Sequence, residues 1–194
     1  MSAPHDDQRL IAETLAGDCQ AFGRLVAKYQ DRLLGSMCAM VRNESDAQDI
    51  VQDALVMAFR KLHLFSGRSS FYTWLFQVAR NVAISKLRSQ KRTVSLDGSP
   101  HDSANGGPMT VEDRGPSPED HLRREEDVEL LRAALCRLSE EFRAILVLRE
   151  MDDMDYEQIA EVLEIPVGTV RSRLHRARAQ LRVELESLMK AAER

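Results

Sequence analysis

The chain of 194 residues contains few cysteines, glycines and prolines, with three, nine and six of them. Cys19, Cys38 and Cys136 lie far apart and form no C-x-x-C pair, so neither a disulfide framework nor a zinc site is predicted, and each should be a small buried or half-buried side chain. No HExxH, GxSxG or phosphate-loop pattern occurs. The sequence therefore indicates a protein that is not an enzyme and that needs no cofactor or metal.

Long apolar runs are also missing. No segment approaches the roughly 20 apolar residues that span a bilayer, and the N-terminus "MSAPHDDQRL" is acidic and polar, unlike a signal peptide. We therefore expect a cytoplasmic protein without membrane insertion.

The scarcity of β-branched alternation, together with 43% hydrophobic residues, predicts an all-α protein built from two small helical domains. Helical periodicity is plain from Asp18 to Val41, with Asp18 as the N-cap. A second helix should start near Asn43 to Ser45, where Ser45 and Gln48 fit a capping box. A third should run from Phe71 to Lys91, with Ser69 or Ser70 as its cap, after a loop from Phe65 to Ser70.

Composition divides the chain into three parts. Residues 93–117 are rich in Ser, Asp, Gly and Pro and should form a flexible acidic linker. Ser117-Pro118 then has the form of a helix start. The predicted domains are residues 1–92 and 118–194.

The formal net charge of −4 conceals a strong local division. Residues 54–96 contain no Asp or Glu, eight basic side chains and six of the ten aromatic residues of the chain. Basic side chains follow phosphates and exposed aromatic rings accept unstacked bases, so this window is typical of a single-strand-binding surface. An alternative interpretation places Phe59, Phe71 and Phe76 in the core.

The other cationic segment follows a short predicted helix. Asp155 and Gln158 form a capping box for Tyr156 to Leu163, and a new helix begins at or just after Pro166. Its apolar stripe is Val170, Leu174, Ala177 and Leu181. Four arginines lie between residues 171 and 178. Helix, tight turn and basic helix is the pattern of a helix-turn-helix that reads a major groove, although arginines can also merely solvate a helix face. The turn position usually held by Gly is Glu164, which tolerates a left-handed backbone at a cost of about 1 kcal/mol.

These features together resemble the bacterial RNA polymerase sigma factors of the extracytoplasmic-function group in the sigma-70 family. The resemblance covers nearly the whole chain. The sequence "DAQDIVQDALVMAF" is similar to the family's polymerase-binding helix, "FSGRSSFYTWLFQVARNVAISKLRSQKR" to its −10 segment, and "MDYEQIAEVLEIPVGTVRSRLHRARAQLR" to its −35 segment.

The resemblance implies a transcription initiation factor that binds core RNA polymerase and directs it to promoters. Its implied partners are the clamp helices and flap of the polymerase, promoter DNA that is duplex at −35 and single-stranded at −10, and an anti-sigma factor. The implied polymerase-binding residues are Asp49, Gln52 and Asp53. Because they lie at i, i+3 and i+4, they share one helix face; a merely solvated face is the alternative.

The resemblance also implies two sets of DNA-binding residues. Those for the −10 element are Phe65, Ser66, Arg68, Ser70, Tyr72, Trp74, Arg80, Asn81, Lys86 and Arg88, of which the loop residues and Asn81 match a pocket for a flipped base. Those for the −35 element are Thr169, Arg171, Ser172, His175, Arg176 and Arg178. Trp74 matches one of two tryptophans that wedge the DNA bubble in housekeeping sigma factors, but its neighbour is Leu75. We therefore expect weak melting and a strict promoter requirement.

Other interpretations remain. The acidic linker resembles a family segment that threads the polymerase's RNA channel, although it could be a plain tether. A stand-alone helix-turn-helix regulator would explain the C-terminal segment but not the basic, aromatic window. A single-strand nucleic-acid chaperone would explain the window but not the helix-turn-helix.

Overall fold

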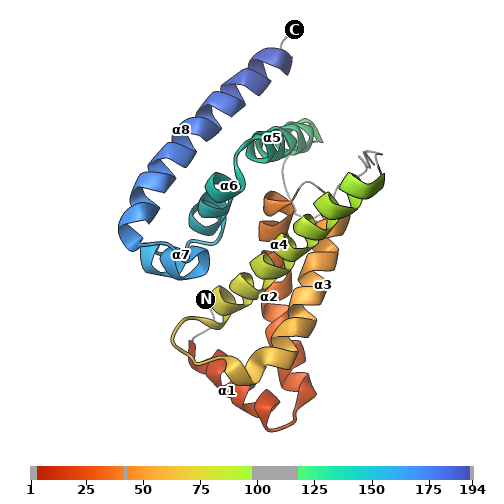
Figure 1. The fold of residues 1–194 in the computed structure, drawn as a ribbon, viewed down its shortest axis with the longest axis vertical. Helices are drawn as coiled ribbons and strands as arrows, with labels where there is room; N and C mark the ends of the chain where they lie inside the picture. The colour runs from red at the N-terminus through yellow and green to blue at the C-terminus, as the bar shows by residue number, and fades with distance from the viewer. Residues whose placement is uncertain (1–3, 42, 98–117, 193–194) are drawn as a thin grey trace.

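The computed structural model describes residues 4–41, 43–97 and 118–192, and these residues form helices joined by short turns, without any strand among them (Figure 1). The all-α prediction is confirmed. The predicted linker of residues 93–117 is wrong at its start, because residues 93–97 continue the helix α4, and its residues 98–117 lie outside the described residues. The helices form two groups. We call α1–α4 the first bundle and α5–α8 the second bundle. None of the described helices is long and apolar enough to cross a bilayer.

The first bundle consists of α1 (Pro4–Leu15), α2 (Cys19–Met40), α3 (Glu44–Lys61), the 3-10 turn η1 (Leu62–Leu64) and α4 (Phe71–Asp97). As predicted, Asp18 caps α2 by accepting a hydrogen bond from the Gln20 amide at 2.9 Å, and Ser70 caps α4 by accepting one from Thr73 at 3.0 Å. The predicted capping box of α3 is wrong. Asn43 is its N-cap, because its side chain accepts from the Ser45 amide.

The second bundle consists of α5 (Pro118–Arg137), α6 (Glu140–Leu146), the π-helical turn η2 (Val147–Met151), α7 (Tyr156–Leu163) and α8 (Val167–Ala192). The Asp155 capping box is present in full. Glu164 has φ 55° and ψ 45°, the left-handed conformation that its position in the turn predicts.

Two predictions about burial are wrong. Phe71 and Phe76 are buried as expected, but Phe59, in the last turn of α3, is 44% exposed. Its ring contacts Phe22 at a centroid distance of 5.0 Å. Cys19, at the first position of α2, is exposed, whereas Cys38 and Cys136 are half-buried as predicted.

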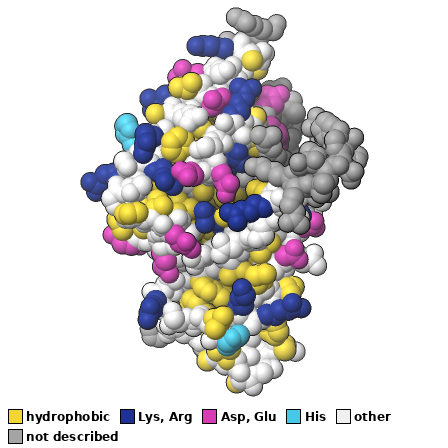
Figure 2. Space-filling model, viewed as in Figure 1, with side chains coloured by type: hydrophobic (Ala, Val, Ile, Leu, Met, Phe, Trp, Pro, Cys, Tyr) yellow, Lys and Arg dark blue, Asp and Glu magenta, His cyan; other side chains and the backbone are white. Residues whose placement is uncertain are grey.

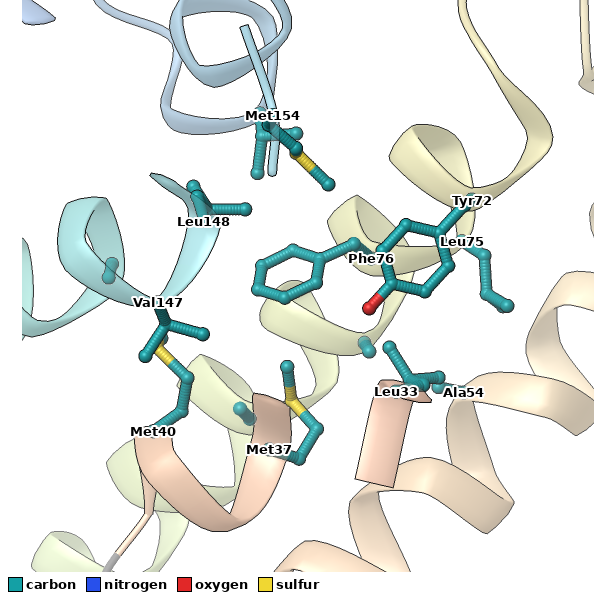
Figure 3. Close-up of a cluster of buried hydrophobic side chains, with 14 of the residues drawn as sticks. Leu33, Met37, Met40, Ala54, Tyr72, Leu75, Phe76, Val147, Leu148 and Met154 are labelled. Carbon is teal, nitrogen blue, oxygen red and sulfur yellow. The ribbon is translucent and has the colours of Figure 1, made fainter. Parts of the chain in front are cut away.

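The two bundles are in contact, which the sequence did not predict. Val147, Leu148 and Met154 of the second bundle point toward Phe76, Met37 and Met40 of the first, and their side chains are buried (Figure 3). A polar contact lies beside this seam, where Arg143 of α6 donates to the Met40 carbonyl at the end of α2 at 2.6 Å. The buried side chains of the two bundles therefore form one continuous cluster.

Candidate nucleic-acid and protein interfaces

A groove between α3 and α4 collects the predicted polymerase-binding residues. Asp49, Gln52 and Asp53 are exposed and line one side of this groove, so they share one face as their spacing predicts. Val56 and Met57 are 48% and 37% exposed and add an apolar strip to the same surface. The groove combines charge with exposed apolar area, as protein-binding surfaces do.

Lys86 lies across this groove from the acidic residues. Its Nζ atom is 2.9 Å from Asp46 Oδ1 and 2.8 Å from Asp49 Oδ2. Burial lowers the pKa of Lys86, but the hydrogen bonds to Asp49 and Asp46 outweigh this effect, so its pKa lies above the ordinary value. In this structure Lys86, predicted to meet −10 DNA, neutralises a carboxylate predicted to meet polymerase.

The loop before α4 presents the next set of predicted residues. Ser66, Arg68 and Ser70 are exposed, and Gly67 provides a turn with φ 71°. Phe65 is half-buried, and its ring lies 5.4 Å from Trp74 and 5.9 Å from Phe71. Trp74 is thus partly accessible beside the loop, where a base could stack on it.

Along α4 the remaining predicted −10 residues separate. Asn81 lies in the groove with Lys86, Arg88 is exposed, and Arg80 is half-buried with its Nε atom shielded from solvent and without a partner in the described structure. Tyr72 is only 4% exposed and faces α2 and the second bundle. Leu75 is fully buried, so a tryptophan here could not pair with Trp74 on the surface.

The basic face of α8 is accessible. Arg171, Ser172, His175, Arg176 and Arg178 are exposed and Thr169 is half-buried, whereas the predicted stripe of Val170, Leu174 and Ala177 is buried. Leu181 is partly buried against the same cluster. This face suits a role in a major groove, because the helix is held by one side and presents donors on the other.

One arginine of this basic face is already paired with a carboxylate. Arg178 forms an ion pair with Glu150 of η2 at 2.6 Å, so its charge is already partnered. Arg171, His175, Arg178 and Arg182 line one hollow beside Tyr156. Arg182 was missed, although its position four residues after Arg178 could have revealed it, since i and i+4 lie on one face.

Charged side chains of both signs mix on the face shown in Figure 2, where exposed apolar side chains gather over the lower part, around the first bundle. Exposed apolar side chains of the first bundle include Val56, Met57, Phe59 and Leu64. The first bundle therefore offers an apolar contact surface beside its charged groove, and the second bundle offers the cationic helix face.

Comparison with known proteins gives matches over both bundles. The family model for Sigma-70 region 2 matches residues 25–93, and that for Sigma-70, region 4 matches residues 129–181. The chain is 37% identical over 194 residues to the RNA polymerase sigma-H factor of Pseudomonas aeruginosa, covering 99% of this chain and 100% of that one. It is 35% identical to the ECF RNA polymerase sigma-E factor of Escherichia coli K12, covering 98% and 100%.

Solved structures share the arrangement of the helices. A sigma factor RpoE in complex with the anti-sigma factor NepR from Bartonella quintana has a TM-score of 0.71 and 27% identity, covering 85% of this chain and 96% of that one. CnrH in complex with the cytosolic domain of CnrY has a TM-score of 0.65 and 25% identity, covering 94% and 98%.

Proposed function

Since the chain belongs to the sigma-70 family of RNA polymerase sigma factors, in its extracytoplasmic-function group, we propose that it binds core RNA polymerase and directs it to promoters with −35 and −10 elements. The observation that carries this function is the presence, on one chain, of both a region 2 bundle and a region 4 helix-turn-helix, matched over nearly the full length of its relatives. A stand-alone regulator would need only the second of these. The chain is therefore an initiation factor.

The groove lined by Asp49, Gln52 and Asp53 is exposed. This exposure supports the proposal that the basic clamp helices of the polymerase bind there. Carboxylates beside exposed Val56 and Met57 can meet a basic partner helix through both charge and apolar area. Lys86 would have to give up Asp49 when that partner binds.

Promoter recognition divides between the bundles. The loop from Phe65 to Ser70, with Trp74 and Asn81, supports binding of the unstacked −10 strand, and the exposed Arg88 supplies a charge for phosphate. The exposed face of α8, with Arg171, Ser172, His175 and Arg176, supports reading of the −35 duplex.

The similar structures imply a further partner. Their names describe sigma factors in complex with anti-sigma factors, so we infer that an anti-sigma factor regulates this chain as well. Because the proposed function needs promoter DNA and polymerase, we propose that the protein acts in the cytoplasm.

Run-off transcription with core RNA polymerase tests the function directly. Promoter fragments from the organism's own genome are transcribed with and without the protein. Start sites that appear only with the protein are expected, and their upstream sequences give both promoter elements. Absence of transcripts, together with failure of the protein to co-migrate with core polymerase, would leave the helix-turn-helix as a regulator acting alone.

A further inference from the structure

The carboxylate of Asp152 lies buried at the contact between the bundles, with only 2% of the residue exposed. Tyr72 of α4 donates its hydroxyl proton to Oδ1 at 2.6 Å. The Ser36 hydroxyl of α2 lies 3.0 and 2.9 Å from the two carboxylate oxygens. Arg32 of α2 donates from Nε to Oδ1 at 3.2 Å and from its terminal nitrogen to the Asp152 carbonyl. We call these four residues the Asp152 cluster.

Asp152 reaches the first bundle because of the local backbone. It follows the π-helical turn η2, and its amide donates to the Val147 carbonyl at 3.1 Å. Asp153 then adopts a left-handed conformation, with φ 50°. This turn aims Asp152 and Met154 at α2 and α4, where Met154 lies near Phe76 in Figure 3. The turn thus presents one carboxylate and one apolar side chain to the other bundle.

Burial of a carboxylate is costly unless hydrogen bonds replace its water. Burial raises the pKa of Asp152, although the hydrogen bonds from Tyr72 and Ser36 and the charge of Arg32 act in the opposite direction. In the described structure, the partners of this side chain come from the first bundle, 80 to 120 residues away in sequence. Its hydrogen bonds are therefore satisfied only while the bundles touch, and water takes over when they part.

The contact is incompatible with simultaneous use of both DNA-binding surfaces. Promoter elements centred near −35 and −10 lie about 25 base pairs apart, or about 85 Å at 3.4 Å per base pair. In the structure α7, the first helix of the helix-turn-helix, packs directly on α4. Tyr72, one of the predicted −10 residues, is also covered by the Asp152 cluster.

We propose that the Asp152 cluster is an autoinhibitory latch, which holds the two bundles closed against each other and must break before the chain can occupy a promoter. That the closed form is inhibited rests on the proposed function, whereas the latch itself rests on the contact alone. The Met-rich apolar seam supports the closed form, because methionine side chains pack well and can also rearrange.

The latch is tested by single-molecule energy transfer on the full chain, without polymerase or DNA. Dyes are attached to cysteines introduced at the exposed positions Ala27 of α2 and Ser187 of α8, in a background without the three native cysteines. Asp152→Ala should raise the open-to-closed ratio by about tenfold or more, since it strands buried polar groups. Glu157→Ala, which removes the same charge from an exposed site on α7, is the matched control. A shift with Asp152→Ala no larger than that with Glu157→Ala overturns the proposal.

A double-mutant cycle guards against a variant that only loosens the second bundle. Ser36→Ala removes a partner from the other side of the contact, and it should also favour the open form. The combined variant should open the chain less than the product of the two single effects, because both remove one interaction. Multiplicative effects would show that Asp152 and Ser36 act separately, and would overturn the latch.

The same variants separate the latch from the proposed function. If Asp152→Ala opens the chain while the wild-type protein yields no transcripts with core polymerase, the latch stands and the proposed function fails. If the wild-type protein initiates transcription while Asp152→Ala leaves the distance distribution unchanged, the function stands and the latch fails.

Discussion

At the scale of single residues, Glu164 has the backbone that departs most clearly from its ordinary preference. With φ 55° it occupies a conformation that costs non-glycine residues about 1 to 2 kcal/mol. We expect Glu164→Gly to leave the free energy of unfolding unchanged or to raise it by up to about 1 kcal/mol, since relief of strain is partly offset by unfolded-state entropy.

Urea unfolding followed by circular dichroism measures this change, with Glu164→Val as the contrasting variant. The branched valine should lower the free energy of unfolding by more than about 1 kcal/mol. If glycine is the more damaging replacement, Glu164 must make a stabilising contact that outweighs its strained backbone.

For single residues, the sequence predicts contacts within one helical turn better than it predicts exposure. The Asp155 and Gln158 box was predictable because both partners lie within one turn of helix. The exposure of Phe59 and Cys19 depends on which elements pack beside them, and neither side chain carries that information. Asp152 had no signal at all, because its partners lie in the distant first bundle.

At the scale of elements, the helices with strong caps and stripes were placed within about a residue. The helix-turn-helix was predicted because its cap, break and stripe agree with one another. By contrast, α1 was not predicted, and α4 runs to Asp97 instead of ending at Lys91. Polar helices without a clear cap or stop leave a weak periodic signal, so packing and context decide their length.

Lys86 bridges the groove between α3 and α4. Its contribution to the free energy of unfolding can therefore be measured by replacing it. Lys86→Met should lower the free energy of unfolding by up to about 1 kcal/mol at neutral pH and low salt, because it removes the ammonium group that Asp46 and Asp49 share. The pKa of Lys86 is raised from 10.5 by folding, so its contribution is fully present below pH 10.5 and is lost as the pH rises through the higher folded value.

Urea titrations from neutral to alkaline pH check both the size and the sign. Lys61→Met, at an exposed position of the same groove, removes an equal charge as the control. Equal losses for the two variants at every pH would mean that the bridge contributes nothing to stability.

The exposed face of α8 makes a second element-level prediction. Arg176→Ala should weaken −35 duplex binding by the holoenzyme by about 1 to 3 kcal/mol if Arg176 holds a guanine edge, or lower the salt slope by about one if it holds a phosphate. Lys190→Ala, near the far end of the same helix, should change neither quantity. Fluorescence anisotropy over a salt series measures both, and an unchanged affinity and slope would remove Arg176 from the interface.

At the scale of the whole molecule, the contact between the bundles was beyond sequence reasoning. Each bundle has periodic stripes that can be assigned to its own core, and nothing in a stripe says that Val147 will lie beside Met40, or Met154 near Phe76, instead of facing water. The predicted division into two domains carried no information on how the two bundles pack together. Contacts of long sequence separation carry no local pattern.

Arg143 adds hydrogen bonds from a charged group to the contact between the bundles. Besides the Met40 carbonyl, it donates to the carbonyls of Leu135, Cys136 and Leu138, so it ties α6 both to the end of α5 and to the first bundle. Arg143→Ala should lower the free energy of unfolding by about 2 to 4 kcal/mol, since several partly buried acceptors lose a charged donor. Arg143→Lys should restore less than half, because an ammonium group cannot reach all of these acceptors.

Chemical unfolding of the full chain gives the comparison. Arg137→Ala is the control, because Arg137 is exposed and its ion pair with Glu184 is long, at 3.6 Å, and this change should cost about 0.5 kcal/mol or less. If Arg143→Lys restores full stability, a single positive charge is enough at this position, and the several donors of the guanidinium group are not needed.

The π-helical turn η2 fixes the direction in which the next residue leaves it. Successive residues of an α-helix point about 100° apart, so removing one residue from Val147–Met151 would rotate the residue that follows by about that angle. Asp152 would then turn away from α2 and lose Tyr72, Ser36 and Arg32 together. A one-residue deletion in η2 would therefore act like several simultaneous substitutions in the first bundle, because it removes the partner that they share.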